Sequence, residues 1–161
     1  MLDKNKDGLI KIPLLVEDMT IKREIVLARP LSNNEYILHS IPAFAYGVAF
    51  GDKVAISDMD KGVFNIITRG NNVTIRLFRQ GTLDTKDIDD LIKKIISNGG
   101  AYEVGKNISA KNESSLLLIN VPVSIGFTAI EEMMKIADQA QSNWEYGNVY
   151  NKDGDPIGWW S

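Results

Sequence analysis

Three places in the sequence carry residue types that could do chemistry, and each indicates a different kind of site. The stretch GVAFGDK, residues 47–53, has two glycines four positions apart and then a lysine, as in loops that bind phosphate. The stretch DKNKDG, residues 3–8, begins like a calcium-binding loop. His39 is the single histidine of the chain, and a catalytic triad or a nitrogen-ligated metal site would depend on it.

The spacing in residues 47–53 does not fit a phosphate-binding loop. Such a loop has four residues between its glycines and then Gly-Lys-Ser/Thr, whereas three residues separate Gly47 from Gly51. Asp52 stands between Gly51 and Lys53, and its carboxylate would repel a phosphate. We therefore predict a turn that leads into a strand, with no phosphate bound. Gly51 should have a positive φ or a contact that leaves no room for a Cβ atom.

The other two places favour structural interpretations. A calcium loop that begins at Asp3 needs a glutamate at its twelfth position, where this chain has Leu14, so we expect a polar N-terminal tail. The chain has no cysteine, and with one histidine we expect no zinc site, no catalytic residue and no cofactor. We interpret His39 as a structural residue of a strand.

Short strands with turn signals between them predict an all-β first half. The expected strands are residues 9–16, 20–28, 36–41, 52–57 and 63–68. Pro13 places the first at a sheet edge. In the second, we expect Ile21, Ile25 and Leu27 on one face, with Lys22 and Glu24 on the other. This spacing predicts a small β-barrel-like or curled antiparallel sheet, and we assign residues 1–71 to a small β domain.

The second half alternates strands with helices. We expect strands at residues 72–78, 101–104, 115–121 and 144–150, and helices at residues 84–100 and 127–142. The resulting order, β-α-β-β-α-β, is that of a ferredoxin-like sandwich. We therefore assign residues 72–161 to a ferredoxin-like α+β domain with an aromatic C-terminal tail.

The first expected helix has a clear apolar stripe. Leu91, Ile92 and Ile95 recur at helical spacing, so we expect them to face the sheet. Asp84 or Thr85 can cap the helix start, and Gly99 can end it. The carboxylates around that start are Asp84, Asp87, Asp89 and Asp90, and we expect Asp87 and Asp90 to face solvent.

The distribution of charge indicates a basic partner. Residues 1–80 carry 11 Lys+Arg and 9 Asp+Glu, whereas residues 81–161 carry 7 and 12, which gives +2 and −5. We expect the acidic second half to bind a basic protein surface, through Asp84, Asp87, Asp89 and Asp90, and the adjacent Trp159 and Trp160 to anchor it. A structural alternative remains. In it, the carboxylates only cap their helix and face water, and the tail folds back on its own domain.

An arginine cluster gives a different hypothesis. Arg69, Arg76 and Arg79 lie close together in the sequence near Phe78, and such a cluster could bind an anion or nucleic acid. The overall charge of −3 argues against nucleic-acid binding. No apolar run is long enough to span a membrane and no signal segment opens the chain, so we expect a cytoplasmic protein.

The stretch EYILHSIPAFAYGVAFGDKVAISD, residues 35–58, resembles the signature of an uncharacterised family of bacterial proteins, domain of unknown function forty-two sixty-five. The matching positions are Ile41, Pro42, Phe44, Gly47, Val48, Gly51, Asp52 and Val54. The later stretches VPVSIGFTAIEEMM and WEYGNVY are similar too, so the resemblance covers about residues 9–150. It implies a shared fold, and it supplies no activity, cofactor or catalytic residue.

By analogy, small cysteine-free bacterial proteins of this kind are often immunity proteins. We therefore expect a protein without enzymatic activity that binds and neutralises a cognate toxin, for example a nuclease, as in contact-dependent growth inhibition. The alternative is a regulatory module that binds a small ligand or nucleic acid. An enzyme is a third possibility, which no visible acid–base arrangement supports. The oligomeric state stays open.

Overall fold

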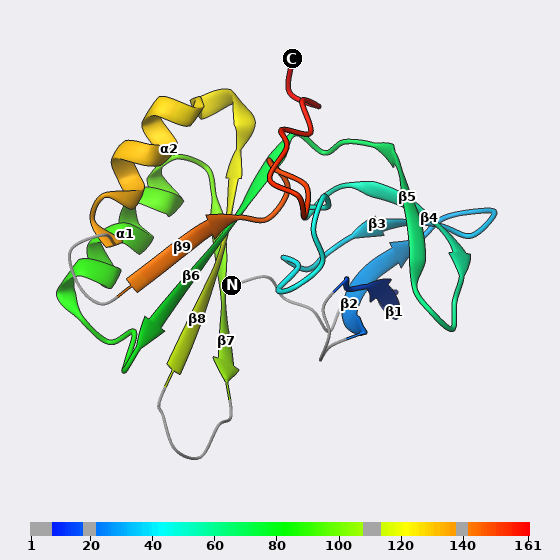
Figure 1. Cartoon of the computed structure of the whole chain (residues 1–161), viewed down its shortest axis with the longest axis horizontal. Coiled ribbons are helices and arrows are strands. Elements are labelled where there is room, and N and C mark those ends of the chain that lie inside the picture. The colour runs from blue at the N-terminus through cyan, green and yellow to red at the C-terminus, as the bar shows by residue number, and fades with distance from the viewer. Residues whose placement is uncertain (1–7, 18–21, 108–113, 138–141) are drawn as a thin grey trace.

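The computed structural model of the chain describes residues 8–17, 22–107, 114–137 and 142–161. Over these residues it contains two antiparallel sheets and two α-helices, and both helices lie on one side of the second sheet (Figure 1). The fold is therefore mixed α+β, as predicted. Most of the calcium-loop-like stretch, residues 3–7, lies outside the described residues.

The first half of the chain forms one five-stranded sheet in which each strand pairs with the next along the sequence. The strands are β1 (Ile10–Leu15), β2 (Arg23–Pro30), β3 (Glu35–Leu38), β4 (Lys53–Asp58) and β5 (Val63–Thr68). β1 is an edge strand, as Pro13 predicted, because proline has no N–H to donate to a neighbour. Gly62 turns the chain between β4 and β5 with a φ of 76°.

This sheet curls around a core of its own without closing into a barrel. Its buried side chains are mainly aliphatic: Ile12, Leu14, Val26, Ala28, Leu38, Val54 and Ile56. The N–H of Leu15 donates to the carbonyl of Gly62 at 2.8 Å, which ties β1 to the turn before β5. Within the described residues β1 and β5 do not pair along their lengths. The curled sheet is therefore the alternative observed, and the barrel-like one is not.

The buried face of β2 is opposite to the predicted one. Ile25 is 57% exposed, whereas Val26 and Ala28 are buried. Glu24, which we expected on the solvent face, shares the alternation of Val26 and accepts a hydrogen bond from the N–H of Ala43 in the loop after β3. Hydrogen bonds to a carboxylate are strong, so partners in that loop outweigh the preference of Glu24 for water.

The second half forms a four-stranded antiparallel sheet with neighbours in the order β7-β8-β6-β9. Its elements are β6 (Asn72–Gln80), α1 (Lys86–Ser97), β7 (Ala101–Asn107), β8 (Ser114–Pro122), the 3-10 turn η1 (Val123–Ile125), α2 (Phe127–Met134) and β9 (Ser142–Tyr146). Apart from η1, the order β-α-β-β-α-β agrees with the prediction. α2 is shorter than predicted, and residues 138–141 lie outside the described part.

α1 packs on the sheet through the predicted stripe. Leu91 and Ile95 are fully buried, and Ile92 packs against the same core. Thr85 is the residue before the first turn, and Gly99, with a φ of 80°, ends the helix. No helix in the described ranges is long and apolar enough to cross a membrane.

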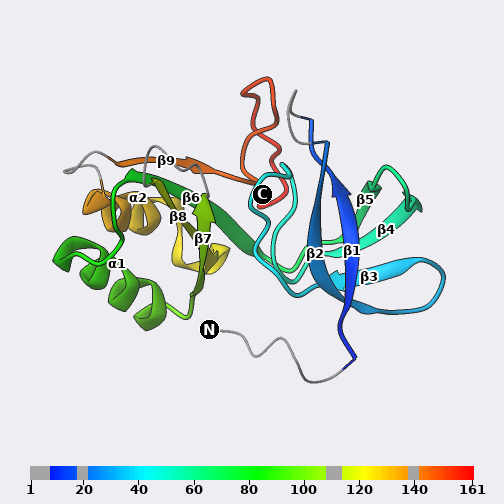
Figure 2. The same ribbon diagram turned by 90° about the horizontal axis from the view of Figure 1, so that it is seen from below.

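Two segments lie between the sheets (Figure 2). One is the inter-sheet loop, residues 41–50, which connects β3 to β4 and is cyan in the figure. The other is the C-terminal segment, residues 147–161, which follows β9. Ile41 packs against Leu116 and Leu118 of β8, so the inter-sheet loop covers part of the second sheet although the first half of the chain supplies it.

Candidate functional site

Glu24 fixes the backbone of the inter-sheet loop by accepting three consecutive N–H groups. Its carboxylate oxygens lie 3.0 Å from the nitrogen of Ala43, 3.0 Å from that of Phe44 and 2.6 Å from that of Ala45. Each of these N–H groups would otherwise need water or another acceptor. One carboxylate therefore satisfies the three backbone donors of the turn. The loop is therefore held in one conformation by a residue of β2.

Arg76 of β6 holds the same loop from the opposite side. Its guanidinium donates to the carbonyls of Pro42 at 3.3 Å and Phe44 at 3.4 Å, and to the carbonyl of Ala45. The side chain is 1% exposed and forms an ion pair with Glu145 of β9 at 3.5 Å. Burial lowers the pKa of Arg76, and the carboxylates of Glu145 and Glu24 act against that shift. The loop thus lies between a carboxylate that binds its N–H groups and a guanidinium that binds its carbonyls.

Asp52 and Arg69 fix the end of this segment. The buried carboxylate of Asp52 accepts the N–H groups of Ala49 at 2.9 Å and Gly70 at 2.8 Å. Arg69 lies 3.4 Å from that carboxylate and donates to the carbonyl of Gly47 at 2.6 Å. Burial raises the pKa of Asp52, and its hydrogen bonds and Arg69 counteract part of this effect. Asp52 is thus a structural acceptor for backbone groups.

The predicted turn at Gly51 is confirmed. Gly51 has a φ of 86°, a conformation that favours glycine. A Cβ atom on Gly70 would lie 2.6 Å from the carbonyl carbon of Gly51, so the two backbones touch. Lys53, which a phosphate loop would direct at its ligand, forms an ion pair with Glu35 at 3.2 Å. This geometry is that of a tight turn feeding β4.

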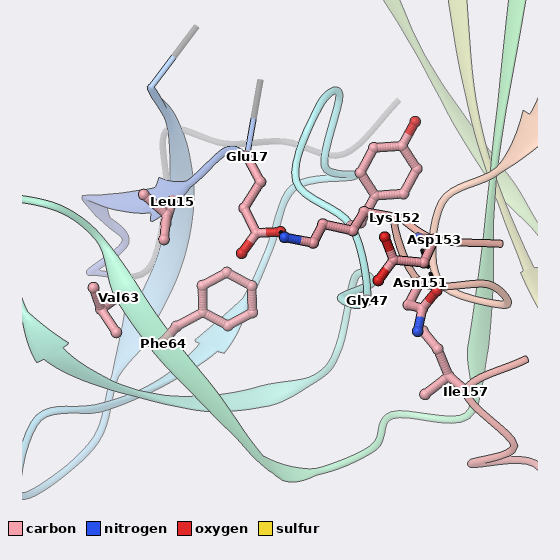
Figure 3. A pocket seen from close by; sticks show the side chains of 10 residues that line it. Leu15, Glu17, Gly47, Val63, Phe64, Asn151, Lys152, Asp153 and Ile157 are labelled. Carbon is pink, nitrogen blue, oxygen red and sulfur yellow. Dashed lines mark hydrogen bonds and ion pairs between the residues drawn. The ribbon is translucent and has the colours of Figure 1, made fainter. Parts of the chain in front are cut away.

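A cavity of about 390 Å³ lies between the first sheet and the C-terminal segment (Figure 3). Leu15, Val63 and Phe64 line it from the first sheet, and Ile157 lies on the opposite side. Glu17 and Lys152 form an ion pair across it at 3.2 Å. Its volume is in the range of sites that bind small molecules.

A second cavity, of about 720 Å³, adjoins the first and shares Glu17, Tyr46, Asn151 and Lys152 with it. We call the two together the inter-sheet cleft. The second cavity is rich in aromatic rings, which come from Tyr46, Trp144, Tyr146 and Tyr150. Three carboxylates line the cleft (Glu17, Glu145 and Asp153), against one cation, Lys152, among the described residues. The cleft is therefore aromatic and acidic.

Carboxylates hold two of these tyrosines in place. The hydroxyl of Tyr46 lies 2.9 and 3.0 Å from the two carboxylate oxygens of Glu145, and that of Tyr146 lies 3.4 Å from Glu131. Burial and the neighbouring Glu145 raise the pKa of Tyr46, and burial and Glu131 raise that of Tyr146. Both phenols are therefore neutral donors at physiological pH.

The predicted acidic docking residues do not form one free surface. Asp84 and Asp89 are exposed and Asp90 is half-buried. Asp87, which we expected to face solvent, is instead bound by the guanidinium of Arg79, with one contact at 3.1 Å. This pairing lowers the pKa of Asp87, because both Arg79 and the hydroxyl of Thr85 donate to its carboxylate. Arg79 is itself buried, so it needs that partner.

The two tail tryptophans are also engaged within the chain. The indole N–H of Trp159 donates to the carbonyl of Asn148 at 2.7 Å, and the guanidinium of Arg69 lies 5.4 Å from its ring. Trp160 packs edge-on against Phe127 at 5.2 Å. The tail thus folds back on the second sheet, which was the structural alternative to a partner anchor.

The arginine cluster and His39 have local partners. Arg69, Arg76 and Arg79 bind carbonyls and carboxylates of this chain, so they do not form an open basic patch. His39 is half-buried, and its ring lies 5.3 Å from that of Phe50. No group of three or more His, Cys, Asp or Glu among the described residues could hold a metal ion.

Sequence reasoning missed the residues that build this site. Glu24 was expected only as a solvent-facing strand residue, and Tyr46 and Glu145 lay in stretches quoted for the family resemblance without a role of their own. Glu24 fits the predicted alternation of β2 as a solvent-facing residue, so the pattern gave no sign that the loop after β3 supplies its partners. The pairing of Tyr46 with Glu145 spans 99 positions and has no local signature.

Comparisons with known proteins show which part of the chain is shared with a family. Residues 24–146 match a family described as a domain of unknown function, DUF4265, and the match runs from Glu24 past Glu145 but excludes the C-terminal segment. A crystal structure of a hypothetical protein from Neisseria gonorrhoeae is similar in fold, with 20% identity and a TM-score of 0.56, over 89% of this chain and 95% of that one. No curated protein matches the chain.

Proposed function

The chain belongs to the family described as a domain of unknown function, DUF4265, and from that premise we propose that it is an immunity-type binding protein that neutralises a cognate bacterial toxin. The observation that carries the proposal is the aromatic and acidic inter-sheet cleft, one wall of which is held by the ion pair of the buried Arg76 with Glu145. Tyrosine and tryptophan are favoured where proteins bind each other tightly.

A basic toxin, such as a nuclease, complements this surface. Residues 81–161 carry a net charge of −5, and the cleft lies against that half of the chain. Opposite charges speed the encounter of two proteins and exclude wrong partners. Asp84, Asp89 and Asp90 are proposed as additional contacts outside the cleft, at the start of α1, whereas Asp87, Trp159 and Trp160 have partners within the chain. In this proposal the protein acts by binding, without enzymatic activity, in the cytoplasm.

Co-expression tests this function directly. A toxin domain encoded beside the gene is expressed in a sensitive host, alone and together with this protein. We expect the protein to restore growth and to co-purify with that toxin in a defined ratio. An unrelated toxin domain is the control and should stay lethal. Continued killing by every neighbouring toxin, with no complex in calorimetry, would exclude the immunity function.

The cavity of about 390 Å³ favours a second candidate, a regulatory module that binds a small ligand. Leu15, Val63, Phe64 and Ile157 make part of its lining apolar, and the pair of Glu17 and Lys152 supplies two charges. A ligand from a metabolite collection that raises the melting temperature of the protein, and no longer does so with Val63→Phe, would support this candidate. A toxin that binds without displacing such a ligand would separate the two activities.

We also propose that residues 72–161 form a ferredoxin-like sandwich and residues 1–71 a small β domain. The element order β-α-β-β-α-β and the strand order β7-β8-β6-β9 support the first assignment. The short connection between β5 and β6 supports the boundary.

A further inference from the structure

We propose that the second cavity of the inter-sheet cleft binds the guanidinium of an arginine side chain that a basic protein partner inserts between the sheets. The site consists of four aromatic residues and the carboxylates of Glu145 and Glu17: Tyr46, Trp144, Tyr146 and Tyr150 supply the rings. Lys152 also lines it and pairs with Glu17 at the exposed surface, so Glu145 is the carboxylate nearest the rings. This inference deepens the proposed function and rests on its premise that the partner is a basic protein.

The aromatic rings are the first argument. A cation over the face of a tyrosine or tryptophan is attracted by the negative potential of the ring. Tyr46 and Tyr150 are 41% and 43% exposed, and both line the cavity. Tyr146 lies between its neighbours, with ring centres 5.1 Å from Trp144 and 6.2 Å from Tyr150. A single cation can therefore contact more than one ring.

The chain already binds guanidinium groups in this way. The guanidinium of Arg76 lies 4.8 Å from the ring centre of Tyr46, and that of Arg69 lies 5.4 Å from that of Trp159. Of these rings, Tyr46 lines the cleft. Arg76 contributes a fixed positive charge beneath the site, and the ion pair with Glu145 offsets it. Tyr46 lines both cavities of the cleft and is 41% exposed.

The carboxylates are the second argument. Glu145 is 38% exposed on its side chain, and Glu17 is 56% exposed, so both can reach a ligand. Tyr46 and Tyr146 direct their hydroxyls at Glu145 and Glu131. Arg76 already lies over the ring of Tyr46, so a ligand in the cavity would meet the part of that ring that Arg76 does not cover. An incoming cation therefore meets the carboxylate of Glu145 and the exposed rings of Tyr46 and Tyr150 in one cavity.

Arginine fits this site better than lysine. Its planar guanidinium stacks on aromatic faces, presents several donors to carboxylates, and is more weakly hydrated than an ammonium group. The cavity is open, so its occupant can be the end of a side chain carried by a large molecule. A partner that inserts a central arginine would use the kind of residue that dominates many interfaces.

The test uses the full-length protein and a capped pentapeptide with one central arginine. The matched probe replaces arginine by citrulline, which keeps the shape of the side chain and removes its charge. Binding is followed through the three indole N–H signals in nuclear magnetic resonance. We expect the Trp144 signal to shift most, and the citrulline peptide to bind about tenfold more weakly. Equal binding of the two peptides would overturn the proposal.

Two variants locate the site. Tyr150→Ala removes an exposed ring of the cavity, and we expect it to weaken the arginine peptide about fivefold. Phe78→Ala is the matched control, because Phe78 is 42% exposed and lies outside the lining of the inter-sheet cleft. It should leave the affinity unchanged. Both variants should give the spectra of a folded protein. Equal losses of affinity for the arginine peptide in the two variants would contradict the placement of the site in this cavity.

The two proposals fail in different ways. A toxin that binds the protein with the same affinity after Tyr150→Ala would overturn the arginine site and leave the immunity function standing. Suppose that binding of the arginine peptide depends on Tyr150, but that every neighbouring toxin still kills cells that co-express this protein. That result would support the arginine site and overturn the immunity function.

Discussion

At the scale of residues, Glu24 is the side chain on which the inter-sheet loop depends most. It accepts three successive N–H groups, and without it those donors would be left in a partly buried position. An unsatisfied buried donor costs more than a hydrogen bond contributes when it is formed. The loop would then have to open toward water, and it would take Tyr46 and one wall of the cleft with it.

We predict that Glu24→Ala lowers the free energy of unfolding by about 2–3 kcal/mol, because three donors to a charged acceptor lose their partner. Urea unfolding followed by tryptophan fluorescence measures this loss. The matched control is Glu17→Ala, which removes a single exposed ion pair with Lys152 and should cost less than about 0.5 kcal/mol. Similar losses in the two variants would mean that Glu24 is not the anchor of the loop.

The pair of Arg79 and Asp87 predicts a pH dependence. Hydrogen bonds from Arg79, and next from Thr85, lower the pKa of Asp87 in the folded state. A lowered pKa means that the stabilisation is complete above the pKa of the unfolded chain, about 3.9, and is lost as the pH falls toward the folded value. Asp87→Asn should therefore cost about 1–2 kcal/mol at pH 7, and the difference from wild type should shrink below about pH 4.

Urea unfolding of both proteins between neutral and acidic pH measures this difference. Asp89→Asn, on the exposed side of the same helix turn, should cost less than about 0.5 kcal/mol at pH 7. A difference for Asp87→Asn that stays constant down to the lowest pH would show that its carboxylate does not bind Arg79 as a charged group.

At the scale of elements, α1 stabilises the second sheet through one face. We predict that Leu91→Ala lowers the free energy of unfolding by about 2–5 kcal/mol, because a fully buried side chain is replaced by a cavity. Ile96→Ala on the same helix is the control: Ile96 is 56% exposed, so its loss should be below about 1 kcal/mol. Chemical denaturation of the two variants compares them. A small effect at Leu91 would mean that α1 is not packed as described.

Most elements were predictable because local patterns determine them. The stripe of α1, Gly99 at its end and Gly62 in the β4–β5 turn are short-range signals, and the structure contains each of them. The inward face of β2 was predicted wrongly, since Val26 and Ala28 are small and the larger Ile25 is exposed. Burial there follows the partners of Glu24, which come from a loop about twenty positions away and leave no trace in the alternation itself.

At the scale of the whole molecule, the two halves share one polar centre. Arg76 of the second sheet binds carbonyls of the inter-sheet loop, and Glu103 of β7 accepts the N–H of Ile41 at 3.1 Å. The backbone N–H of Gly47 also donates to the carbonyl of Gly147 at 2.9 Å. Separating the halves would expose a buried guanidinium and unpaired backbone groups, so neither half is complete alone.

We therefore predict a single cooperative unfolding transition. All three tryptophans belong to the second half, so their fluorescence follows that half, whereas far-ultraviolet circular dichroism follows both sheets. The two signals should change at the same urea concentration. Two separate midpoints would show that the sheets unfold independently and that the shared polar centre does not couple them.

The inter-sheet cleft was beyond prediction from the sequence for a physical reason. Its lining joins Glu17 and Tyr46 from the first half with Trp144 and Tyr150 from the end of the chain. The placement of these residues depends on how two sheets sit against each other, and no periodicity encodes that. The charge imbalance between the halves drew attention to acidic groups, but Glu145, which lines the cleft, was not among the carboxylates we selected.

Glu24 and Arg76, which hold the inter-sheet loop, also determine the order in which the parts of the cleft can form while the chain is synthesised from its N-terminus. Glu24 is made before the loop, whereas Arg76 follows it and Glu145 comes much later. Until β9 is translated, the guanidinium of Arg76 lacks its ion-pair partner and β6 lacks one of its two neighbours. The first sheet can form early on the ribosome, but the aromatic wall of the cleft cannot. The aromatic lining of the inter-sheet cleft is thus complete only after β9 and the segment that follows it have emerged.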